Sequence, residues 1–132
     1  MKRVIVSGYF SKIRSGHLDL LEGAAKIADY VIVIVNNDKQ RMLKVGSIDV
    51  GEKSRVRLMN NMRLVNEVVL SIDDGFSVSQ TLDSIAQKYP EDELIFANGG
   101  DRDSAEDVPE AEVCKKYNIE LRYNVGERTS DE

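Results

Sequence analysis

The sequence has few of the residues on which cross-linked, metal-bound or membrane-embedded proteins depend. Among its 132 residues there are one cysteine, one histidine, two prolines and no tryptophan. Cys114 has no second cysteine with which to form an internal disulfide or a zinc site. No apolar run approaches the roughly 18 residues of a membrane-spanning helix, and the first residues lack the apolar region of a secretory signal. These absences predict a cytoplasmic protein without a membrane partner.

An excess of positive charge is missing as well. The chain carries 18 Lys and Arg residues against 23 Asp and Glu residues, a formal net charge of −5 at pH 7. Nucleic acids attract broadly basic surfaces, so this balance argues against a nucleic-acid partner, although it is compatible with a local basic pocket. Hydrophobic residues make up 42% of the chain, as in ordinary globular proteins, and the length predicts a single domain over residues 1–132.

Apolar segments of strand length alternate with helical segments along the chain. Strands are predicted at residues 4–6, 30–35, 66–71, 93–97 and 119–123. Helices are predicted at residues 15–28 and 52–62, after residue 77 and from residue 108, and residues 39–51 predict a long loop or a ragged helix. This alternation predicts a Rossmann-like α/β domain: a five-stranded, mostly parallel sheet of order 3-2-1-4-5 with helices on both faces.

Local patterns mark several element boundaries. Residues 77–80 have the capping-box pattern before a helix, and Pro109 fits the first turn of the last helix. Cys114 would then be a small core residue. Asp73 and Asp74 could bind a metal, but aspartate more often bonds the local backbone in a turn, so the turn is the favoured interpretation.

The first candidate site is a strand that passes through a glycine turn into a helix. Gly8 is predicted to supply the freedom to leave the strand, and Ser15 and Gly16 open the helix. Backbone N–H groups in the first turn of a helix bind phosphate well, and His17 falls in this turn. The face expected to pack on the sheet consists of Leu18, Leu21, Ala25 and Ala28. The pattern favours a nucleotide site over a structural glycine turn whose histidine is satisfied by hydrogen bonds.

The second candidate site follows the fourth strand. Gly99 and Gly100 let the backbone approach a ligand closely, and Asp101 and Arg102 add an acceptor and a cation. A flexible turn is the alternative. In the predicted strand order this turn and the first glycine turn are neighbours outside the carboxyl ends of the strands, so they predict one pocket. Lys44, after the second strand, is equally compatible with a phosphate-facing and a solvated position.

Two motifs give the chain a family resemblance. Residues 8–10 and 14–17 resemble the G-x-F-D-x-x-H-x-G-H signature of cytidylyltransferase-like nucleotidyltransferases, which holds the triphosphate of a nucleotide. Ser11 stands where the family usually has Asp, and Arg14 stands at its first His. The rest is similar to small adenylyltransferases related to the heptose phosphate enzymes of lipopolysaccharide core biosynthesis. The similar segments are residues 34–38, Lys44 before Gly46, Glu52 with Arg55, residues 66–74, and residues 96–102 followed by 108–110 and Cys114.

The resemblance implies transfer of a nucleotidyl group, AMP in preference to CMP, from a nucleoside triphosphate to a phosphorylated acceptor such as a sugar phosphate. It implies His17, Arg14 and Lys44 as catalytic residues, Mg²⁺ carried with the triphosphate, and a homodimer. The nucleotide-binding residues it implies are Gly8, Tyr9, Phe10, Ser11, Arg14, Ser15, Gly16, His17, Gly99, Gly100, Asp101, Arg102, Thr129 and Ser130. A nucleotide-binding module without catalysis is one alternative, because the first motif is altered and the last, serine-rich motif is short. A protein-interaction domain is another, because a fold alone does not fix function.

Overall fold

Parallel strands form one sheet at the centre of the computed structural model, which describes residues 1–99 and 108–126. The strands are β1 (Lys2–Gly8), β2 (Tyr30–Val35), β3 (Glu67–Leu70), β4 (Glu93–Ala97) and β5 (Glu120–Arg122). They pair in the order β3-β2-β1-β4-β5, and each neighbouring pair is parallel. The Rossmann-like α/β fold and the strand order predicted from the sequence are confirmed.

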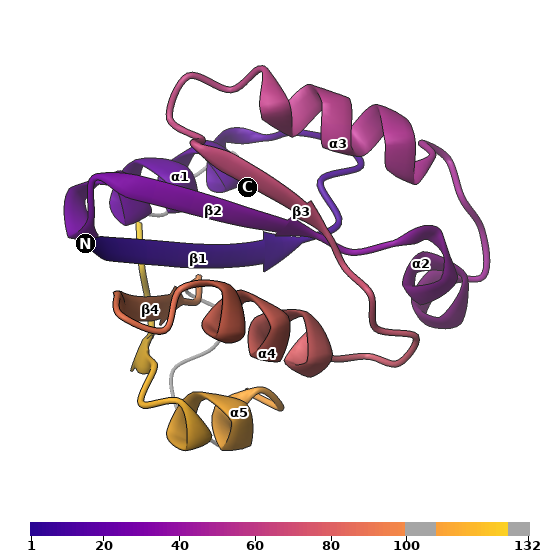
Figure 1. The fold of residues 1–132 in the computed structure, drawn as a ribbon. Coiled ribbons are helices and arrows are strands. Elements are labelled where there is room, and N and C mark those ends of the chain that lie inside the picture. The colour runs from indigo at the N-terminus through magenta and orange to yellow at the C-terminus, as the bar shows by residue number, and fades with distance from the viewer. Residues whose placement is uncertain (100–107, 127–132) are drawn as a thin grey trace.

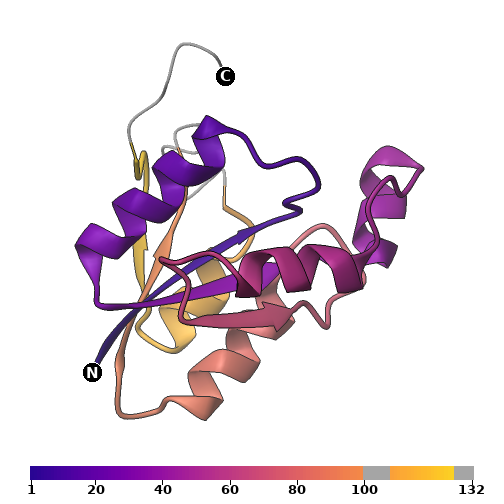
Figure 2. The ribbon, with the colours of Figure 1, turned by 90° about the horizontal axis from the view of Figure 1, so that it is seen from above.

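Helices cover both faces of the sheet (Figure 1). They are α1 (Ser15–Ile27), α2 (Asp38–Val45), α3 (Glu52–Asn60), α4 (Ser79–Lys88) and α5 (Ala111–Lys116). Helices α1 and α3 lie on one face, which Figure 2 shows from above, and α4 and α5 lie on the other, whereas α2 stands apart beyond the end of β2. Within the described ranges, no helix combines the length and the apolar character that crossing a membrane requires.

The central strands are apolar on both faces because both faces are covered. Val4 and Val6 belong to the core cluster that includes Leu21 of α1, while Ile5 between them belongs to the cluster that includes Leu82 of α4. The predicted face of α1 needs one correction: Leu18 is 44% exposed. The buried face is centred on the small residue Ala24, which the spacing of the larger apolar residues did not single out.

Helix α2 forms the first part of the stretch at residues 39–51, where the sequence predicted a long loop or a ragged helix, and residues 46–51 are a loop. The Asn37 side chain accepts a hydrogen bond from the Gln40 N–H (2.9 Å), and the Gln40 side chain accepts one from the Asn37 N–H (3.1 Å). Gly46 ends the helix in the left-handed conformation (φ +84°). The helix contributes little to the core, so its sequence has no apolar periodicity. The residues that cap its two ends are therefore the stronger sequence signal for a helix.

The capping box predicted at residues 77–80 is wrong. Helix α4 begins at Ser79 after Val78, which makes no side-chain cap. The buried Asp73 carboxylate caps the helix instead: it accepts hydrogen bonds from the backbone N–H groups of Gln80 (2.8 Å) and Thr81 (3.0 Å). The local hydrogen-bonding interpretation of Asp73 is therefore confirmed, with the cap supplied from a preceding turn.

The start of the last helix also differs from the prediction. Residues 108–110 form a turn, in which the Ala111 N–H donates to the Val108 carbonyl (3.2 Å), and α5 begins only at Ala111. Pro109 therefore precedes the helix. Val108 and Glu110 on either side of it are both buried, which holds the turn against the core. Cys114 is buried as predicted, and this burial raises the pKa of its thiol to about 12.

The segment after β5 packs directly on the backbone of α1. Gly126 has a φ of +88°, and a Cβ atom there would lie 2.3 Å from the Asp19 carbonyl oxygen. The Val125 N–H donates to the Asn98 carbonyl (2.9 Å), which ties the same segment to the end of β4. The ends of β4 and β5 and the first half of α1 are thus brought together at the carboxyl edge of the sheet.

The Asp73 cap predicts a difference between two adjacent carboxylates. Asp73→Ala is expected to lower the free energy of unfolding by about 2 kcal/mol, because it removes the cap of α4 and leaves buried N–H groups unpaired. The exposed neighbour supplies the control, and Asp74→Ala should change stability by less than about 0.5 kcal/mol. Urea unfolding followed by circular dichroism measures both values. Equal losses for the two variants would contradict the cap.

Candidate functional site

A cavity of about 720 Å³ opens at the carboxyl edge of the sheet. Its floor includes Gly8 at the end of β1 and Asn36 and Asn98 after β2 and β4. Helix α1 and the segment after β5 form one wall, and the segments before α4 and α5 form the opposite wall. Parallel α/β sheets bind ligands at this edge, and the volume suits a small organic ligand.

The structure places the residues of the sequence-predicted site in three groups. The lining of the cavity contains Gly8, Tyr9, Phe10, Gly16, His17, Lys44 and Gly99. Ser11, Arg14 and Ser15 lie in the loop and first turn beside it but do not line it. Gly100, Asp101, Arg102, Thr129 and Ser130 lie outside the described residues. Gly8 and Gly99, from the ends of β1 and β4, therefore line the same cavity.

Strain in the first turn lies at Phe10 rather than at Gly8. Phe10 has a φ of +54°, in the left-handed region, and its side chain is buried. Such a conformation costs about 1–3 kcal/mol and persists only where the surroundings fix it. A Cβ atom on Gly8 would lie 3.0 Å from the Phe10 ring, so glycine is needed there to admit the ring. The sequence prediction that Gly8 is needed for its backbone freedom is wrong in this respect.

His17 is oriented by the backbone at the start of α1. Its Nδ1 accepts a hydrogen bond from the backbone N–H of Arg14 (3.0 Å), and the backbone N–H of His17 donates to the Arg14 carbonyl (3.0 Å). The ring also packs against Phe10, with 5.4 Å between the ring centroids. Because Nδ1 is an acceptor, the proton of the neutral imidazole lies on Nε2, which makes that nitrogen a hydrogen-bond donor.

The altered positions of the family signature lie beside the cavity. Arg14 is the N-cap residue of α1 and its side chain is exposed. The Ser11 hydroxyl is buried, and it has no hydrogen-bond partner among the residues that the structure describes. A buried hydroxyl normally has a hydrogen-bond partner, so the Ser11 hydroxyl is an unsatisfied polar group of this loop.

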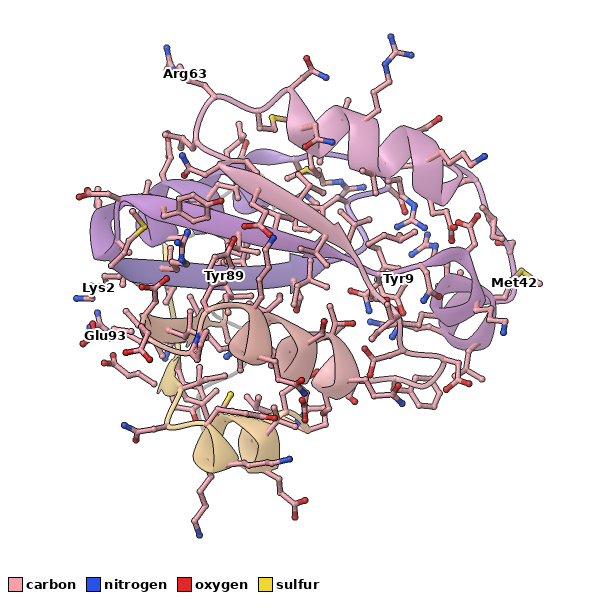
Figure 3. The ribbon with its side chains drawn as sticks, viewed as in Figure 1. Lys2, Tyr9, Met42, Arg63, Tyr89 and Glu93 are labelled. Atoms are coloured by element: carbon pink, nitrogen blue, oxygen red, sulfur yellow. The ribbon has the colours of Figure 1, made fainter. Side chains whose placement is uncertain are left out.

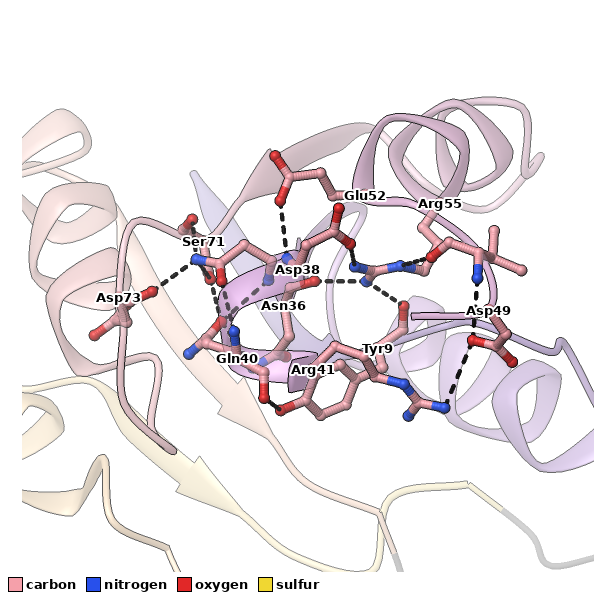
Figure 4. Close-up of polar contacts among 12 residues, drawn as sticks. Tyr9, Asn36, Asp38, Gln40, Arg41, Asp49, Glu52, Arg55, Ser71 and Asp73 are labelled. Carbon is pink, nitrogen blue, oxygen red and sulfur yellow. Dashed lines mark hydrogen bonds and ion pairs between the residues drawn. The ribbon is translucent and has the colours of Figure 1, made fainter. Parts of the chain in front are cut away.

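A buried arginine joins the loop after β1 to the segments around it (Figure 4). The Arg55 side chain is fully buried, and its Nη1 donates to the carbonyl groups of Tyr9 (2.8 Å) and Asn36 (2.5 Å). Its Nε donates to the Val50 carbonyl (2.9 Å), and its Nη2 pairs with Asp38 (2.9 Å). The sequence suggested Arg55 only through the family resemblance. Its position in the helix also indicates burial, because Arg55 stands one helical turn before the buried Met59 and therefore lies on the same face.

Gln40 holds the loop on the opposite wall of the cavity. Its side chain is buried, and Nε2 donates to the carbonyl groups of Gly75 (2.9 Å) and Ser77 (2.9 Å). Phe76 lies between these two fixed carbonyls and lines the cavity, although it is 69% exposed. The loop is therefore fixed while the aromatic ring that it carries stays open to solvent. Sequence reasoning did not identify Gln40 or Phe76.

Two positively charged side chains lie close to the ring of Tyr9, which Figure 3 labels. Its hydroxyl donates to the Gln40 carbonyl (3.2 Å), and burial raises the pKa of that hydroxyl, which stays protonated at neutral pH. The Arg41 guanidinium and the Lys44 ammonium lie 5.4 and 5.3 Å from the centre of its ring. Lys44 also lines the cavity. Its position is compatible with the predicted contact to phosphate, which stays a prediction.

Another polar cluster lies at the opposite edge of the sheet, where Figure 3 labels Lys2, Tyr89 and Glu93. The Arg3 guanidinium lies over the rings of Tyr30 (4.2 Å) and Tyr89 (3.7 Å), and both tyrosine hydroxyls donate to the Glu67 carboxylate. Burial and the bond to Glu67 raise the pKa of Tyr30 to about 12. These groups satisfy one another, as expected of a structural cluster.

The described parts of the chain contain no group of three or more His, Cys, Asp and Glu residues arranged to hold a metal ion. The cavity lining nevertheless contains oxygen donors, namely the Asp19 carboxylate and the Asn36 and Asn98 amides. Oxygen atoms of this kind suit Mg²⁺.

Comparison with known proteins identifies the family to which this chain is similar. The family model described as Cytidylyltransferase-like matches residues 5–125. The bifunctional protein HldE of Koribacter versatilis is 32% identical over 100 residues, which are 74% of this chain and 19% of that protein. FAD synthase of Ferroglobus placidus is 35% identical over 74 residues, 56% of this chain and 48% of that one. Glycerol-3-phosphate cytidylyltransferase of Bacillus subtilis is 32% identical over 69 residues, 52% and 54% of the respective chains.

The matched segments span only about half the length of the FAD synthase and of the glycerol-3-phosphate cytidylyltransferase. A longer structural match is the crystal structure of the lipopolysaccharide core biosynthesis protein from Thermoplasma volcanium GSS1. It superposes with a TM-score of 0.71 and covers 96% of this chain and 98% of that one, at 22% sequence identity. At this identity the match shows a shared fold.

The buried position of Arg55 predicts a large and specific effect on stability. Arg55→Ala is expected to lower the free energy of unfolding by about 3 kcal/mol, because three carbonyl groups and Asp38 lose a charged donor. Arg57 lies on the same helix and is exposed, so Arg57→Ala should cost less than about 0.5 kcal/mol. Urea unfolding compares the two. A similar small loss for both variants would show that Arg55 does not hold these segments together.

Proposed function

The chain is a member of the cytidylyltransferase-like family, and from this premise we propose that it transfers a nucleotidyl group from a nucleoside triphosphate to a small phosphorylated acceptor and releases pyrophosphate. The observation that carries the proposal is the cavity whose lining joins His17 of α1, Lys44 of α2 and Gly99 after β4. One cavity thus combines a helix start, a lysine and a glycine turn, which together suit a triphosphate.

In the proposed reaction an oxygen of the acceptor phosphate attacks the α-phosphorus of the triphosphate. The bond from that phosphorus to the bridging oxygen breaks, and pyrophosphate leaves with the electron pair. The attacking oxygen is already anionic, so no base has to remove a proton from it. The protein has to align the two phosphates and neutralise the charge that grows on the leaving pyrophosphate.

Residues on both sides of the first turn would together align the phosphates and neutralise the charge on the leaving group. The Nε2–H of His17 would donate to a phosphate oxygen, while its Nδ1 stays bonded to the backbone. The N–H groups at the start of α1 would add the positive end of the helix dipole. Lys44 would bring a full charge from α2. Backbone groups of Tyr9, Phe10 and Gly99 would enclose the nucleotide, in agreement with their place in the cavity lining.

Mg²⁺ would enter the cavity with the triphosphate and offset part of its negative charge. Asp19, Asn36 and Asn98 would supply protein oxygen atoms to it.

We further propose AMP in preference to CMP as the transferred group and a sugar phosphate as the acceptor, in a pathway such as lipopolysaccharide core biosynthesis. The support is the similarity of residues 96–102 to the heptose phosphate enzymes and the HldE relatives, which match three quarters of this chain. The Bacillus subtilis relative is named for glycerol 3-phosphate and a cytidylyl group, so CTP and glycerol 3-phosphate belong in every assay. The predicted homodimer is part of the same proposal.

Pyrophosphate release is the direct test, measured with ATP or CTP and a set of sugar and polyol phosphates. His17→Asn is expected to lower this activity strongly, because asparagine keeps an acceptor for the Arg14 N–H but loses the Nε2 donor. Binding is measured separately: a triphosphate at about a hundred times its Kd should stabilise the protein by about 2.7 kcal/mol, seen as a higher Tm. His17→Asn should lose most of that rise. Binding without release of pyrophosphate would mean a nucleotide-binding module instead of an enzyme.

Arg14 is predicted to bind the outer phosphates from its position at the start of α1. A guanidinium keeps its charge at every physiological pH and can hold phosphate oxygens with two parallel hydrogen bonds. Arg14→Ala should therefore weaken ATP binding by roughly five-fold and AMP binding less, and Arg14→His should restore part of the loss. Lys12→Ala, an exposed change in the same loop, is the control in calorimetric titrations. Equal losses for ATP and AMP, or none, would remove Arg14 from the site.

A further inference from the structure

Three residues with six-membered aromatic rings, Tyr9, Phe10 and Phe76, line the cavity, and their rings differ in what they contact. Phe10 is buried, and its ring packs against that of His17. The ring of Tyr9 lies beside two positively charged side chains. Phe76 is 69% exposed, and no ring or cation of a described residue lies against it. Of these three rings, that of Phe76 is therefore the one that a ligand in the cavity can cover.

The loop that carries Phe76 is held in place by a buried side chain. The Nε2 of Gln40 donates to the carbonyl groups of Gly75 and Ser77 (2.9 Å each), which lie on either side of Phe76. Gln40 is fully buried, and its Oε1 accepts from the backbone N–H of Asn37 (3.1 Å). A flat ring on a loop that is already fixed loses little conformational freedom when a ligand covers it.

A neighbouring residue shows that exposure alone does not distinguish Phe76. Ile72, in the same loop, is 63% exposed, but it does not line the cavity. Single exposed apolar side chains are common on protein surfaces and need no ligand. Phe76 differs because it is exposed inside a concave site, where aromatic side chains commonly provide the surface on which small ligands pack.

The strand order separates Phe76 from the part of the cavity proposed for the nucleotide. Gly8 ends β1 and Gly99 follows β4, and these two strands are neighbours. Phe76 follows β3, which lies beyond β2 on the other side of β1. In the proposed reaction the acceptor phosphate meets the triphosphate near the start of α1. The rest of the acceptor then has room toward the loop after β3.

We propose that Phe76 is a specificity-determining residue that stacks on a ring of the acceptor. The acceptor is then a cyclic sugar phosphate and not an open-chain polyol phosphate. One face of a sugar ring presents carbon-bound hydrogens with a small positive partial charge, and the face of an aromatic ring is negative. Their contact also removes apolar area from water. This proposal rests on the proposed function, since it takes the acceptor to share the cavity with the triphosphate.

Matched ligands test the proposal by binding alone. Glucose 6-phosphate and mannose 6-phosphate form rings, whereas sorbitol 6-phosphate and mannitol 6-phosphate are their reduced, open-chain counterparts with the same number of carbons. The unmodified chain is expected to bind each cyclic ligand roughly five-fold more tightly than its counterpart in calorimetric titrations, because stacking on one aromatic ring strengthens binding by about this factor.

Three substitutions assign the preference to the ring of Phe76. Phe76→Tyr keeps the ring and should keep the preference, whereas Phe76→Leu keeps an apolar side chain without a flat face and should lose most of it. Ile72→Ala is the matched control, since it changes an exposed apolar residue outside the cavity lining, and it should leave the preference intact. ATP affinity should be the same in the unmodified chain and in Phe76→Leu. Because both positions are exposed, the midpoint of urea unfolding should be unchanged in all three variants.

The proposal is overturned if the unmodified chain prefers neither cyclic ligand, or if Phe76→Leu keeps the full preference. It is also overturned if Phe76→Leu weakens ATP binding as much as hexose phosphate binding, because the ring would then stack on the nucleotide. Pyrophosphate release, measured on the same samples, tests the transfer separately. A ring preference that depends on Phe76 in a chain that releases no pyrophosphate supports the stacking and refutes the transfer. Release of pyrophosphate without such a preference supports the transfer and refutes the stacking.

Discussion

One buried guanidinium connects the loop after β1 with the segments that follow and precede it around the cavity. Arg55 donates to the loop after β1, the end of β2 and the loop before α3, and pairs with the first residue of α2. Carbonyl groups beyond the ends of parallel strands have no strand partner, and burying them without a donor is costly. A single side chain serves several of them, so these segments keep their relative positions only as a group. The turn that carries Phe10 depends on this bond network.

The two walls of the cavity are linked through the residue that follows β2. Asn36 is buried, its carbonyl accepts from Arg55, and its amide donates to the Gln40 side chain (3.2 Å). Arg55 fixes the loop near His17, and Gln40 fixes the loop that carries Phe76, so Asn36 connects the supports of both walls. A polar network of this kind fixes the shape of a site before any ligand arrives, which reduces the reorganisation that binding requires.

The sequence predicted the features that depend on local pattern and failed where distant residues decide. Buried parallel strands appear as continuous apolar segments, so the sheet, its order and the position of Gly8 and Gly99 in one cavity were predictable. Asp73 caps a helix from outside its own turn, and Arg55 binds segments far along the chain, so neither has a local signal for its partner. Helix α2 contributes little to the core and lacks an apolar stripe. The need for Gly8 arises from the Phe10 ring, which only the folded turn places against it.

The contact between Gly126 and the backbone of α1 also sets an order of events in folding. The first helix is near the start of the sequence, and the segment that covers it comes almost at the far end of the described chain. Closing so long a loop is entropically unfavourable until most of the sheet between the two segments exists. The strand core can therefore form first and the cavity last. During synthesis, the helix that carries His17 leaves the ribosome well before the segment around Gly126, because the two lie far apart in the sequence.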